Sequence, residues 1–394
     1  MSRSAFAVLT APGRGGIAVI RCVGPAVEAA LQGTFRPAAR GPAMPALGTL
    51  AYGHILDADG SVLDEVIVYH ASGPVASAAG NGPPLTVYEV NCHGGPAAVA
   101  AVCGALAARG VEQVEPDTLL AIEGAGATER IARRLLRRAT TPLAARILLD
   151  QLGGALAAAV AHATDALAAD RAAEAATTVK GLLERWRCCG RFLADPPRVV
   201  IAGRPNAGKS TLLNRLVGAD RVLTAAAPGT TRDYVEADAA LGGLPVVLVD
   251  TAGLGDARDQ VEQLGVERAH EQTAGAAIVV YLLDAATGAT ADDGAALDRL
   301  GNRAIAVWNK ADVAPGPLGA PGVLAVSALT GDGIEDLSGA VLARLGYRAT
   351  GPGDAVPLTV EQAECLGGAQ QLIAAGKPAE ALAVLVPLAQ DSRR

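Results

Sequence analysis

The sequence predicts a multidomain α/β protein, with a small α+β domain at its N-terminus and a mostly parallel sheet inserted into a helical domain. Three observations support this fold class. The chain has 394 residues, enough for about two to four domains. From Arg198 to Gly346, short β-rich runs alternate with helical spacing, which is typical of a parallel sheet with helices on both faces. Helical patterns with few turn signals flank this region.

Residues 1–115 are expected to form the α+β domain. Turns rich in Gly and Pro separate its short β-like runs, and an Ala-rich helical stretch follows at Ala97–Arg109. The β-like runs are Ala5–Thr10, Ile17–Arg21, Val66–Tyr69 and Thr86–Asn91.

A helical domain is expected in two parts, residues 116–196 and 348–394. Pro196–Pro197 ends the first part, and the Gly/Pro-rich linker Thr350–Pro357 precedes the second. If the two parts pack together, residues 197–347 form an insertion within one helical domain. The β-rich runs of this insertion are Val199–Ala202, Val246–Val249, Ile278–Leu283, Ile305–Val307 and Val323–Val326.

Composition and charge exclude several classes of protein. With 51% apolar and 19% charged residues, the chain is too apolar to be disordered. A net charge of −7 argues against a protein that coats nucleic acid or anionic membranes through bulk charge. No apolar run approaches the ~18–20 residues of a spanning helix, and Ala5–Leu9 is too short for a signal peptide. We therefore expect a cytoplasmic protein without membrane contact.

The segment Gly203–Ser210 fits the pattern G-x-x-x-x-G-K-[ST], directly after a β-like run and before a helical one. Backbone N–H groups of such a loop surround phosphate oxygens at a helix N-terminus. Lys209 is expected to reach the β- and γ-phosphates, and the Ser210 hydroxyl to bind Mg²⁺. We assign nucleotide contacts here to Asn206, Ala207, Gly208, Lys209, Ser210 and Thr211.

Two further motifs end predicted strands. In Asp250-Thr251-Ala252-Gly253, the Asp250 carboxylate can hold the magnesium shell and Gly253 can approach the γ-phosphate. In Asn309-Lys310-Ala311-Asp312, the Asp312 carboxylate can accept from N1–H and the 2-amino group of guanine, two donors that adenine lacks. Asn309 is expected to address the opposite edge of the base, with Lys310 over the ring.

The last motif, Ser327-Ala328-Leu329, follows the last β-rich run and would close over the base. Each motif alone could be an ordinary strand-end turn. Together, in this order, they match the small GTP-binding (G) domain. In the switch segment Gly229–Asp233, one threonine should reach Mg²⁺ and the γ-phosphate. Leu254 stands where many GTPases place a water-orienting Gln, so another group must orient water or the protein is a slow switch.

At this point the sequence resembles the MnmE-type (TrmE) tRNA-modification GTPases. In the G domain the resemblance rests on Gly203–Ser210, Gly229–Asp233 and Asp250–Leu254, continuing to Val261–Arg268. Near the N-terminus, Ala11–Ile17 through Arg21 and Glu89–Pro96 look like the formyl-tetrahydrofolate domain of that family. A G domain inserted between helical segments matches as well.

The resemblance implies a potassium-stimulated GTPase, in which the two G domains of a homodimer meet with a potassium ion near the phosphates. A fixed cation there supplies the positive charge that phosphoryl transfer needs. By matching position, Glu262 positions the attacking water, and Lys209 and Thr231 complete the catalytic set. The implied metal ligands are Ser210 and Thr231 for magnesium, and Asn206, Thr230 and the backbone oxygens of Ala225 and Ala227 for potassium.

The resemblance also implies ligands and partners outside the G domain. Arg21 and Glu89 match residues that hold 5-formyl-tetrahydrofolate or a related folate, because a carboxylate can pair with the donor edge of a pterin. The family modifies the wobble uridine of tRNA (carboxymethylaminomethyl type) together with an FAD-dependent partner of the MnmG (GidA) type.

Two departures from the family pattern keep an alternative open. The family ends in a Cys-x-Gly-Lys motif, whereas this sequence ends in Gln390–Arg394, and Leu136 aligns with a lysine near the folate. The alternative is a divergent regulatory GTPase switch that has lost the tRNA-modification step. A helical stripe of arginines could meet RNA phosphates, or form an ordinary solvated or carboxylate-paired face. Its members are Arg130, Arg133, Arg134, Arg137 and Arg138.

Overall fold

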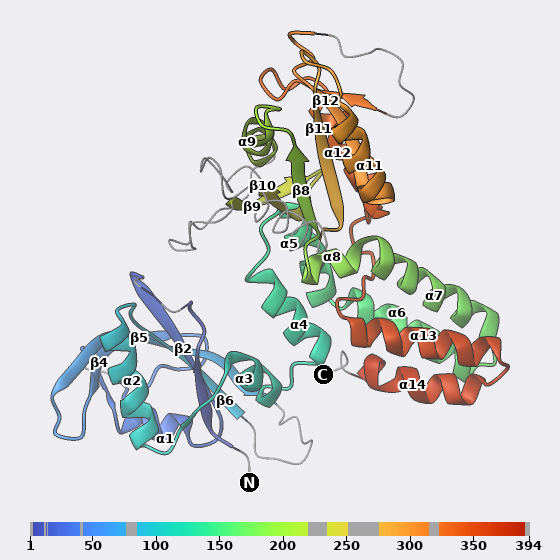
Figure 1. The fold of residues 1–394 in the computed structure, drawn as a ribbon. Coiled ribbons are helices and arrows are strands. Elements are labelled where there is room, and N and C mark those ends of the chain that lie inside the picture. Colours follow the sequence, from blue (N-terminus) through green and yellow to red (C-terminus); the bar gives the residue numbers. More distant parts are fainter. Residues whose placement is uncertain are drawn as a thin grey trace. The chain divides into compact units, whose positions relative to one another are not determined.

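The computed structural model describes residues 3–11, 13, 15–39, 42–75, 85–219, 235–250, 276–314 and 323–390. The chain forms two compact units (Figure 1). The first is built from residues up to Arg130, and the second from Ile131–Ala389. Each unit has its own buried apolar core.

The first unit contains a seven-stranded sheet in the order β3-β4-β5-β6-β2-β1-β7. Neighbouring strands are antiparallel, except β1 and β7, which are parallel. Strands β3, β4 and β7 add to the runs expected from sequence; β3 and β7 are too short, at three and two residues, to show a periodic signal. The strands are β1 (Ala5–Val8), β2 (Ile17–Val23), β3 (Phe35–Pro37), β4 (Leu50–Leu56), β5 (Val62–Val75), β6 (Leu85–His93) and β7 (Glu112–Gln113).

Three helices cover this sheet, on both of its faces. Helices α1 and α2 bury one face, whose core includes Ile20, Val68 and Val90. On the other face, Leu119 of α3 is fully buried against Ala5 and neighbouring apolar residues. Because α3 belongs to this core, the first unit continues to Arg130, past the boundary of 115 expected from sequence. The helices are α1 (Val27–Gln32), α2 (Pro96–Ala108) and α3 (Pro116–Ile122).

In the second unit, the helices before and after the G domain share one apolar core. Residues of α6, α7, α13 and α14 form a single buried cluster, so the β-rich region is an insertion in the helical domain, as the sequence predicts. Gly190, in the π-helical turn Trp186–Gly190, lies directly against the carbonyl of Pro357. The helices are α4 (Ala127–Leu136, of which the residues up to Arg130 belong to the first unit), α5 (Pro142–Leu152), α6 (Ala155–Ala168), α7 (Ala172–Arg185), α8 (Arg191–Ala194), α13 (Val360–Ala374) and α14 (Pro378–Gln390).

Among the described residues, no single helix is long and apolar enough to cross a membrane, and only α5 and α6 taken together, bent by 46° at their junction, reach that length and composition.

The inserted G domain has a six-stranded sheet in the order β13-β12-β11-β8-β10-β9. All neighbouring strands are parallel except β9 and β10. Strand β9 is an edge strand missed from sequence, because polar Glu236 and Asp238 interrupt its apolar residues. The strands are β8 (Arg198–Gly203), β9 (Val235–Leu241), β10 (Leu244–Asp250), β11 (Ile278–Asp284), β12 (Ala304–Asn309) and β13 (Leu324–Ala325).

Helices cover both faces of the G-domain sheet, as expected. Helices α9 (Lys209–Ala219) and α12 (Ile334–Leu345) pack on one face, over Ile201, Leu248 and Val280. Helix α11 (Ala291–Leu300) packs on the other. The carboxyl ends of β8, β10, β11 and β12 therefore meet at one edge, where ligands bind in open parallel sheets.

Candidate nucleotide-binding site

The turn from β8 into α9 requires glycine at two positions. Gly203 has φ of 140°, and a Cβ there would lie 2.5 Å from the carbonyl oxygen of Leu282 on β11. Gly208 has φ of 93°, and a Cβ there would overlap the side chain of Asn309. Asn206 also has a positive φ, of 62°. The tight loop lets α9 begin at Lys209, with its first N–H groups at the sheet edge.

Lys209 is held over this loop by two backbone carbonyls. Its Nζ donates to the oxygens of Gly203 and Arg204, both at 3.0 Å. Burial lowers the pKa of the Lys209 ammonium, and the nearby Asp250 carboxylate opposes that effect. An ammonium has three N–H donors, so one remains for a phosphate oxygen.

Ser210 and Asp250 bring two oxygen donors together beside Lys209. The Ser210 hydroxyl donates to Oδ2 of Asp250 at 2.7 Å, and Asp250 is buried at the end of β10. Hydroxyl and carboxylate oxygens suit Mg²⁺, which usually keeps several waters and substrate phosphates as its other ligands. These two residues therefore fit a magnesium shell. Over the described residues, no cluster of three or more His, Cys, Asp or Glu could bind a metal by itself.

Asn309 links the phosphate loop (Gly203–Gly208) to the loop expected to cover the base (Ser327–Leu329, the base loop). Its Nδ2 donates to the carbonyl oxygen of Ala207 at 2.8 Å, and its Oδ1 accepts from the N–H of Ala328 at 3.0 Å. The side chain is almost fully buried. Sequence reasoning assigned Asn309 to an edge of guanine and missed this link between two loops.

The remaining base-site residues are tied to neighbours in the same way. Ser327 donates to Oδ1 of Asp312 at 2.6 Å, which orients that carboxylate. Lys310, with φ of 67°, pairs through Nζ with Oδ2 of Asp284 at 2.7 Å. The hydrogen bond from Lys310 holds the pKa of Asp284 below its ordinary value, against the effect of burial. Asp284 was missed from sequence, although its place at the end of a β-rich run is the same signal that marked Asp250.

Arg215, on α9, forms hydrogen bonds with the base loop. Its Nε donates to the carbonyl oxygen of Ala328 at 3.1 Å, and its Nη2 donates to that of Leu329. No sequence motif pointed to this contact, because the acceptors are backbone oxygens more than a hundred residues away.

Comparisons with known proteins agree with this geometry. A family model described as "50S ribosome-binding GTPase" matches residues 198–310, and one described as "GTP-binding protein TrmE N-terminus" matches residues 4–117. A tRNA modification GTPase MnmE from Parasynechococcus marenigrum is 37% identical over 384 residues, covering 88% of this chain and 82% of the relative. Another, from Chloroflexus aurantiacus, is 34% identical over 426 residues, covering 97% and 92%.

The chain belongs to the MnmE family of tRNA modification GTPases. It is therefore a GTPase, and the predicted fold class and family are confirmed. The MnmE relatives match across both units of this chain, so the resemblance extends well beyond the phosphate loop.

Several residues that the MnmE resemblance singles out lie outside the described residues. They are Ala225, Ala227, Thr230, Thr231, Thr251, Ala252, Gly253 and Glu262.

The first unit brings together the two residues expected to hold a folate. Arg21 on β2 lies directly opposite Glu89 on β6, and Nη1 of Arg21 is 2.5 Å from Oε1 of Glu89. Glu123, which follows α3, also binds Arg21, at 2.6 Å from Nε. Two carboxylates thus share one guanidinium. Sequence reasoning missed Glu123 because it lies 102 residues from Arg21 along the chain.

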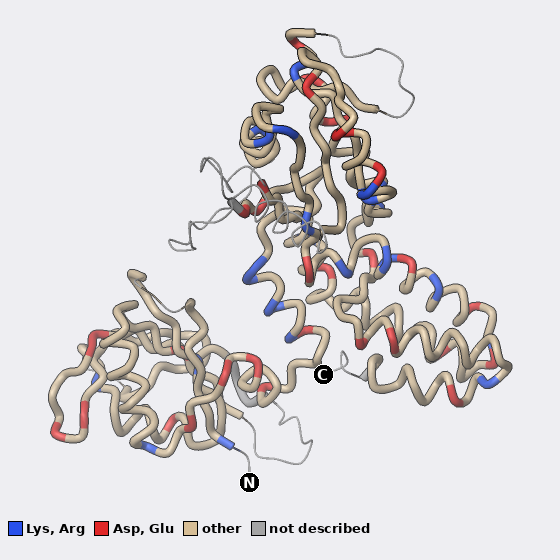
Figure 2. Tube along the Cα trace, in the orientation of Figure 1, with Lys and Arg blue, Asp and Glu red and all other residues tan. Residues whose placement is uncertain are grey.

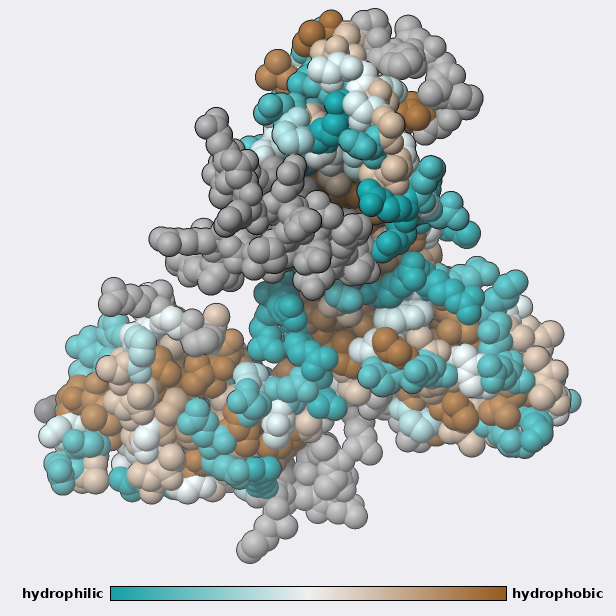
Figure 3. Space-filling model, in the orientation of Figure 1, coloured by the Kyte–Doolittle hydropathy of each residue, from teal (hydrophilic) through white to brown (hydrophobic). Residues whose placement is uncertain are grey.

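Of the arginines expected on one helical face, Arg130, Arg133 and Arg134 lie on α4, whereas Arg137 and Arg138 lie in the turn after it, because the helix ends at Leu136. The basic residues of α4 are drawn in blue in Figure 2. Arg130 pairs with Asp117 at 3.2 Å, within the first unit. Arg133, Arg134, Arg137 and Arg138 are exposed, and hydrophilic side chains cover α4 on the face shown in Figure 3. Leu136 packs instead against the apolar core of the neighbouring helices.

Proposed function

We propose that this protein binds GTP with Mg²⁺ at the carboxyl edge of the G-domain sheet, and hydrolyses it in the modification of the tRNA wobble uridine. One observation carries the proposal. Lys209, Asp250, Asp284 and Asn309 lie at or just after the ends of four neighbouring parallel strands. Each of these four side chains is held by a hydrogen bond to another described residue.

The phosphate end of the site has the groups that a nucleoside triphosphate needs. Lys209 offers its remaining N–H to the β- and γ-phosphates, and the N–H groups from Asn206 to Thr211 surround the phosphate oxygens. Ser210 would hold Mg²⁺ directly, together with Thr231 of the switch segment. Magnesium supplies positive charge next to the phosphates.

The base end selects guanine by hydrogen bonds that adenine cannot make. Asp312, oriented by Ser327, accepts from N1–H and the 2-amino group of guanine. With ATP these two donors are absent, and the carboxylate would lose both contacts with the base at a cost in binding free energy. The Lys310 stem covers one face of the base, while Ala311, Ala328 and Leu329 complete the wall.

Hydrolysis is assigned to Glu262, which would orient the attacking water in place of the Gln that Leu254 replaces. We further propose that a potassium ion, held by Asn206, Thr230 and the backbone around Ala225 and Ala227, stabilises charge in the transition state when two G domains meet. The family resemblance supports this part, and Asn206, with φ of 62°, lies in the turn just before Gly208.

Outside the G domain, we propose a homodimer that works with an FAD-dependent partner of the MnmG type on tRNA. The first unit would bind a folate of the 5-formyl-tetrahydrofolate type. Glu89 and Glu123 together exceed the charge of Arg21, so the cluster fits the donor edge of a pterin ring. Calorimetry with 5-formyl-tetrahydrofolate should show binding that Glu89→Gln weakens and that Glu112→Gln, in an exposed ion pair elsewhere in this unit, does not.

The experiment that tests the central proposal is GTP hydrolysis in potassium chloride and in sodium chloride at equal ionic strength. We expect a large potassium-specific increase in turnover. Glu262→Ala should keep GTP affinity and slow hydrolysis at least about tenfold. Asp298→Ala, which removes an exposed carboxylate on α11, is the matched control. Equal slow rates in both salts would contradict the potassium and Glu262 assignments and leave a GTP-binding switch.

A further inference from the structure

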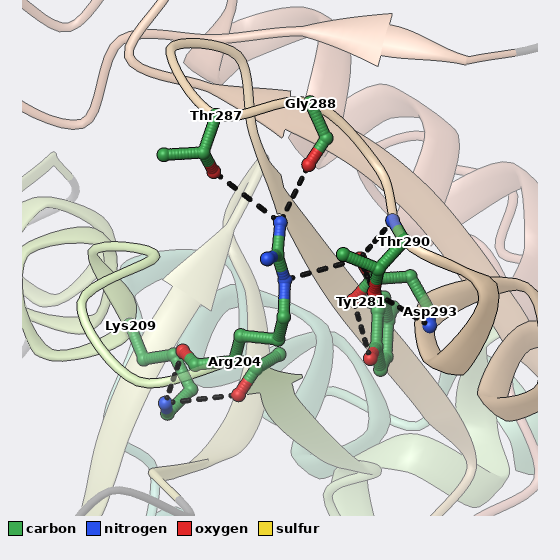
Figure 4. Close-up of polar contacts among 8 residues, drawn as sticks. Arg204, Lys209, Tyr281, Thr287, Gly288, Thr290 and Asp293 are labelled. Carbon is green, nitrogen blue, oxygen red and sulfur yellow. Dashed lines mark hydrogen bonds and ion pairs between the residues drawn. The ribbon is translucent and has the colours of Figure 1, made fainter.

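Arg204, the second residue of the phosphate loop, sends its side chain away from the loop toward the segment after β11 (Figure 4). Its Nε lies 3.0 Å from Oδ2 of Asp293. Its Nη2 donates to the carbonyl oxygen of Gly288 at 2.5 Å and to the hydroxyl of Thr287 at 3.3 Å. One guanidinium thus joins the phosphate loop to the loop between β11 and α11.

Asp293 is a charged group in a fully buried position. Its residue is 0% exposed, and it accepts from the N–H and the hydroxyl of Thr290, both at 2.8 Å, and from the hydroxyl of Tyr281 at 3.0 Å. Burial alone would raise its pKa, but these hydrogen bonds and the Arg204 charge outweigh it, so the pKa lies below the ordinary value. The carboxylate is therefore ionised when it meets Arg204.

Helix capping explains only part of this arrangement. Thr290 and Asp293 form a capping box at the start of α11. A capping box needs only those two residues. Here the same carboxylate also binds Tyr281 from β11 and Arg204 from the phosphate loop, so it joins three segments of the G domain.

Arg204 also touches the group expected to meet the phosphates. Its backbone carbonyl accepts from Nζ of Lys209 at 3.0 Å, next to the carbonyl of Gly203. Gly203 is fixed by its close approach to Leu282 on β11. The second acceptor belongs to Arg204, whose side chain is bound to Asp293 (Figure 4).

We propose that the Arg204–Asp293 ion pair is a tether that holds the phosphate loop in the form in which Lys209 meets the GTP phosphates. Arg204 and Asp293 are then positioning residues, acting through the Arg204 carbonyl on Lys209. This inference rests on the GTP site proposed above. It predicts a defect at the phosphate end of the nucleotide and none at the guanine contact of Asp312, a carboxylate that Ser327 orients.

The test measures the affinity of the full-length protein for mant-GDP by fluorescence titration. Arg204→Met removes the tether but leaves a buried carboxylate without its cation, which is itself destabilising. The double variant Arg204→Met/Asp293→Asn removes that charge too, so it separates a folding defect from loss of positioning. Arg198→Met is the matched control, since Arg198 pairs with Glu236 at 2.6 Å on exposed surface at the opposite end of β8.

We expect the double variant to melt within a few degrees of wild type and to bind mant-GDP about tenfold more weakly, the scale of one lost charge-assisted hydrogen bond. Arg204→Lys should recover part of the affinity, because an ammonium can still reach Asp293. The ratio of GDP to IDP affinity, which reports the 2-amino contact of Asp312, should stay at the wild-type value. Arg198→Met should bind as wild type does.

Two results would overturn the tether. In one, the double variant is folded and binds mant-GDP as tightly as wild type. In the other, the ratio of GDP to IDP affinity falls together with GDP affinity, which would mean that the whole site has loosened. If wild-type protein fails to bind mant-GDP at all, the proposed GTP site itself is overturned, and the tether with it.

Discussion

The link made by Asn309 gives a quantitative prediction. The side-chain amide of Asn309 forms hydrogen bonds with the backbone of Ala207 and of Ala328, and these two alanines are 1% and 3% exposed. Asn309→Ala would leave a carbonyl oxygen and an N–H without partners in a site closed to water. Each unsatisfied buried group costs about 1–3 kcal/mol, so both together cost about 2–6 kcal/mol. Since the two partners belong to the phosphate loop and the base loop, nucleotide affinity should fall as well.

Thermal unfolding of the full chain, with and without GDP, measures this effect. Even the lower bound of about 2 kcal/mol corresponds to a fall in Tm of about 4–8 °C for a domain of about 150–250 residues. Asn302→Ala is the control, because Asn302 is exposed and its backbone carbonyl, the acceptor for Arg344, is unchanged. If Asn309→Ala keeps both the Tm and the mant-GDP affinity of wild type, the link between the two loops does not stabilise the site.

Two further predictions concern acid stability and helix packing. Because Lys310 lowers the pKa of Asp284, the pair stabilises the fold above the ordinary carboxyl pKa of about 3.9, and this contribution is lost as the pH falls through the lower folded-state value. Asp284→Asn should therefore lower Tm at neutral pH, with a gap that closes in acid; a gap independent of pH would contradict this. Gly190→Ala should destabilise the helical core by about 1–3 kcal/mol in chemical unfolding, because its Cβ would overlap the backbone of Pro357. Gly367→Ala, in open space on α13, should have little effect, and equal losses in both variants would refute the packing argument.

The sequence could predict the parts of the G domain that follow from local chemistry. A phosphate loop needs glycines at particular turns, and Gly203 and Gly208 do have the positive φ values that such a turn requires. Apolar runs ending in Asp250 and Asn309 marked two buried parallel strands, whose carboxyl ends share one edge for topological reasons. Edge strand β9 escaped prediction because one side of an edge is solvated and its apolar signal is interrupted.

The partners of the site residues could not be predicted in this way. Arg204 and Asp293 are 89 positions apart (293 − 204), and neither belongs to a motif that names the other. Glu123 reaches Arg21 only because α3 folds back onto the first sheet. The local sequence pattern predicts which side chains lie at the end of a strand, but only the three-dimensional fold determines which distant side chains contact them.

The contacts between loops in this site organise nucleotide binding, whereas the hydrolysis step is assigned to residues on other segments. Gly203 is fixed by Leu282, Asn309 by Ala207, and Arg204 by Asp293, so contacts among its own residues organise the described part of the site. The residues proposed to act on water and on the γ-phosphate, Thr231 and Glu262, come from other segments. Substitutions in these contacts between loops should therefore change nucleotide affinity and, through it, KM. Glu262→Ala should instead change kcat. This difference between affinity and turnover follows from the sheet topology, because the strands that carry the phosphate and base residues are neighbours in one sheet.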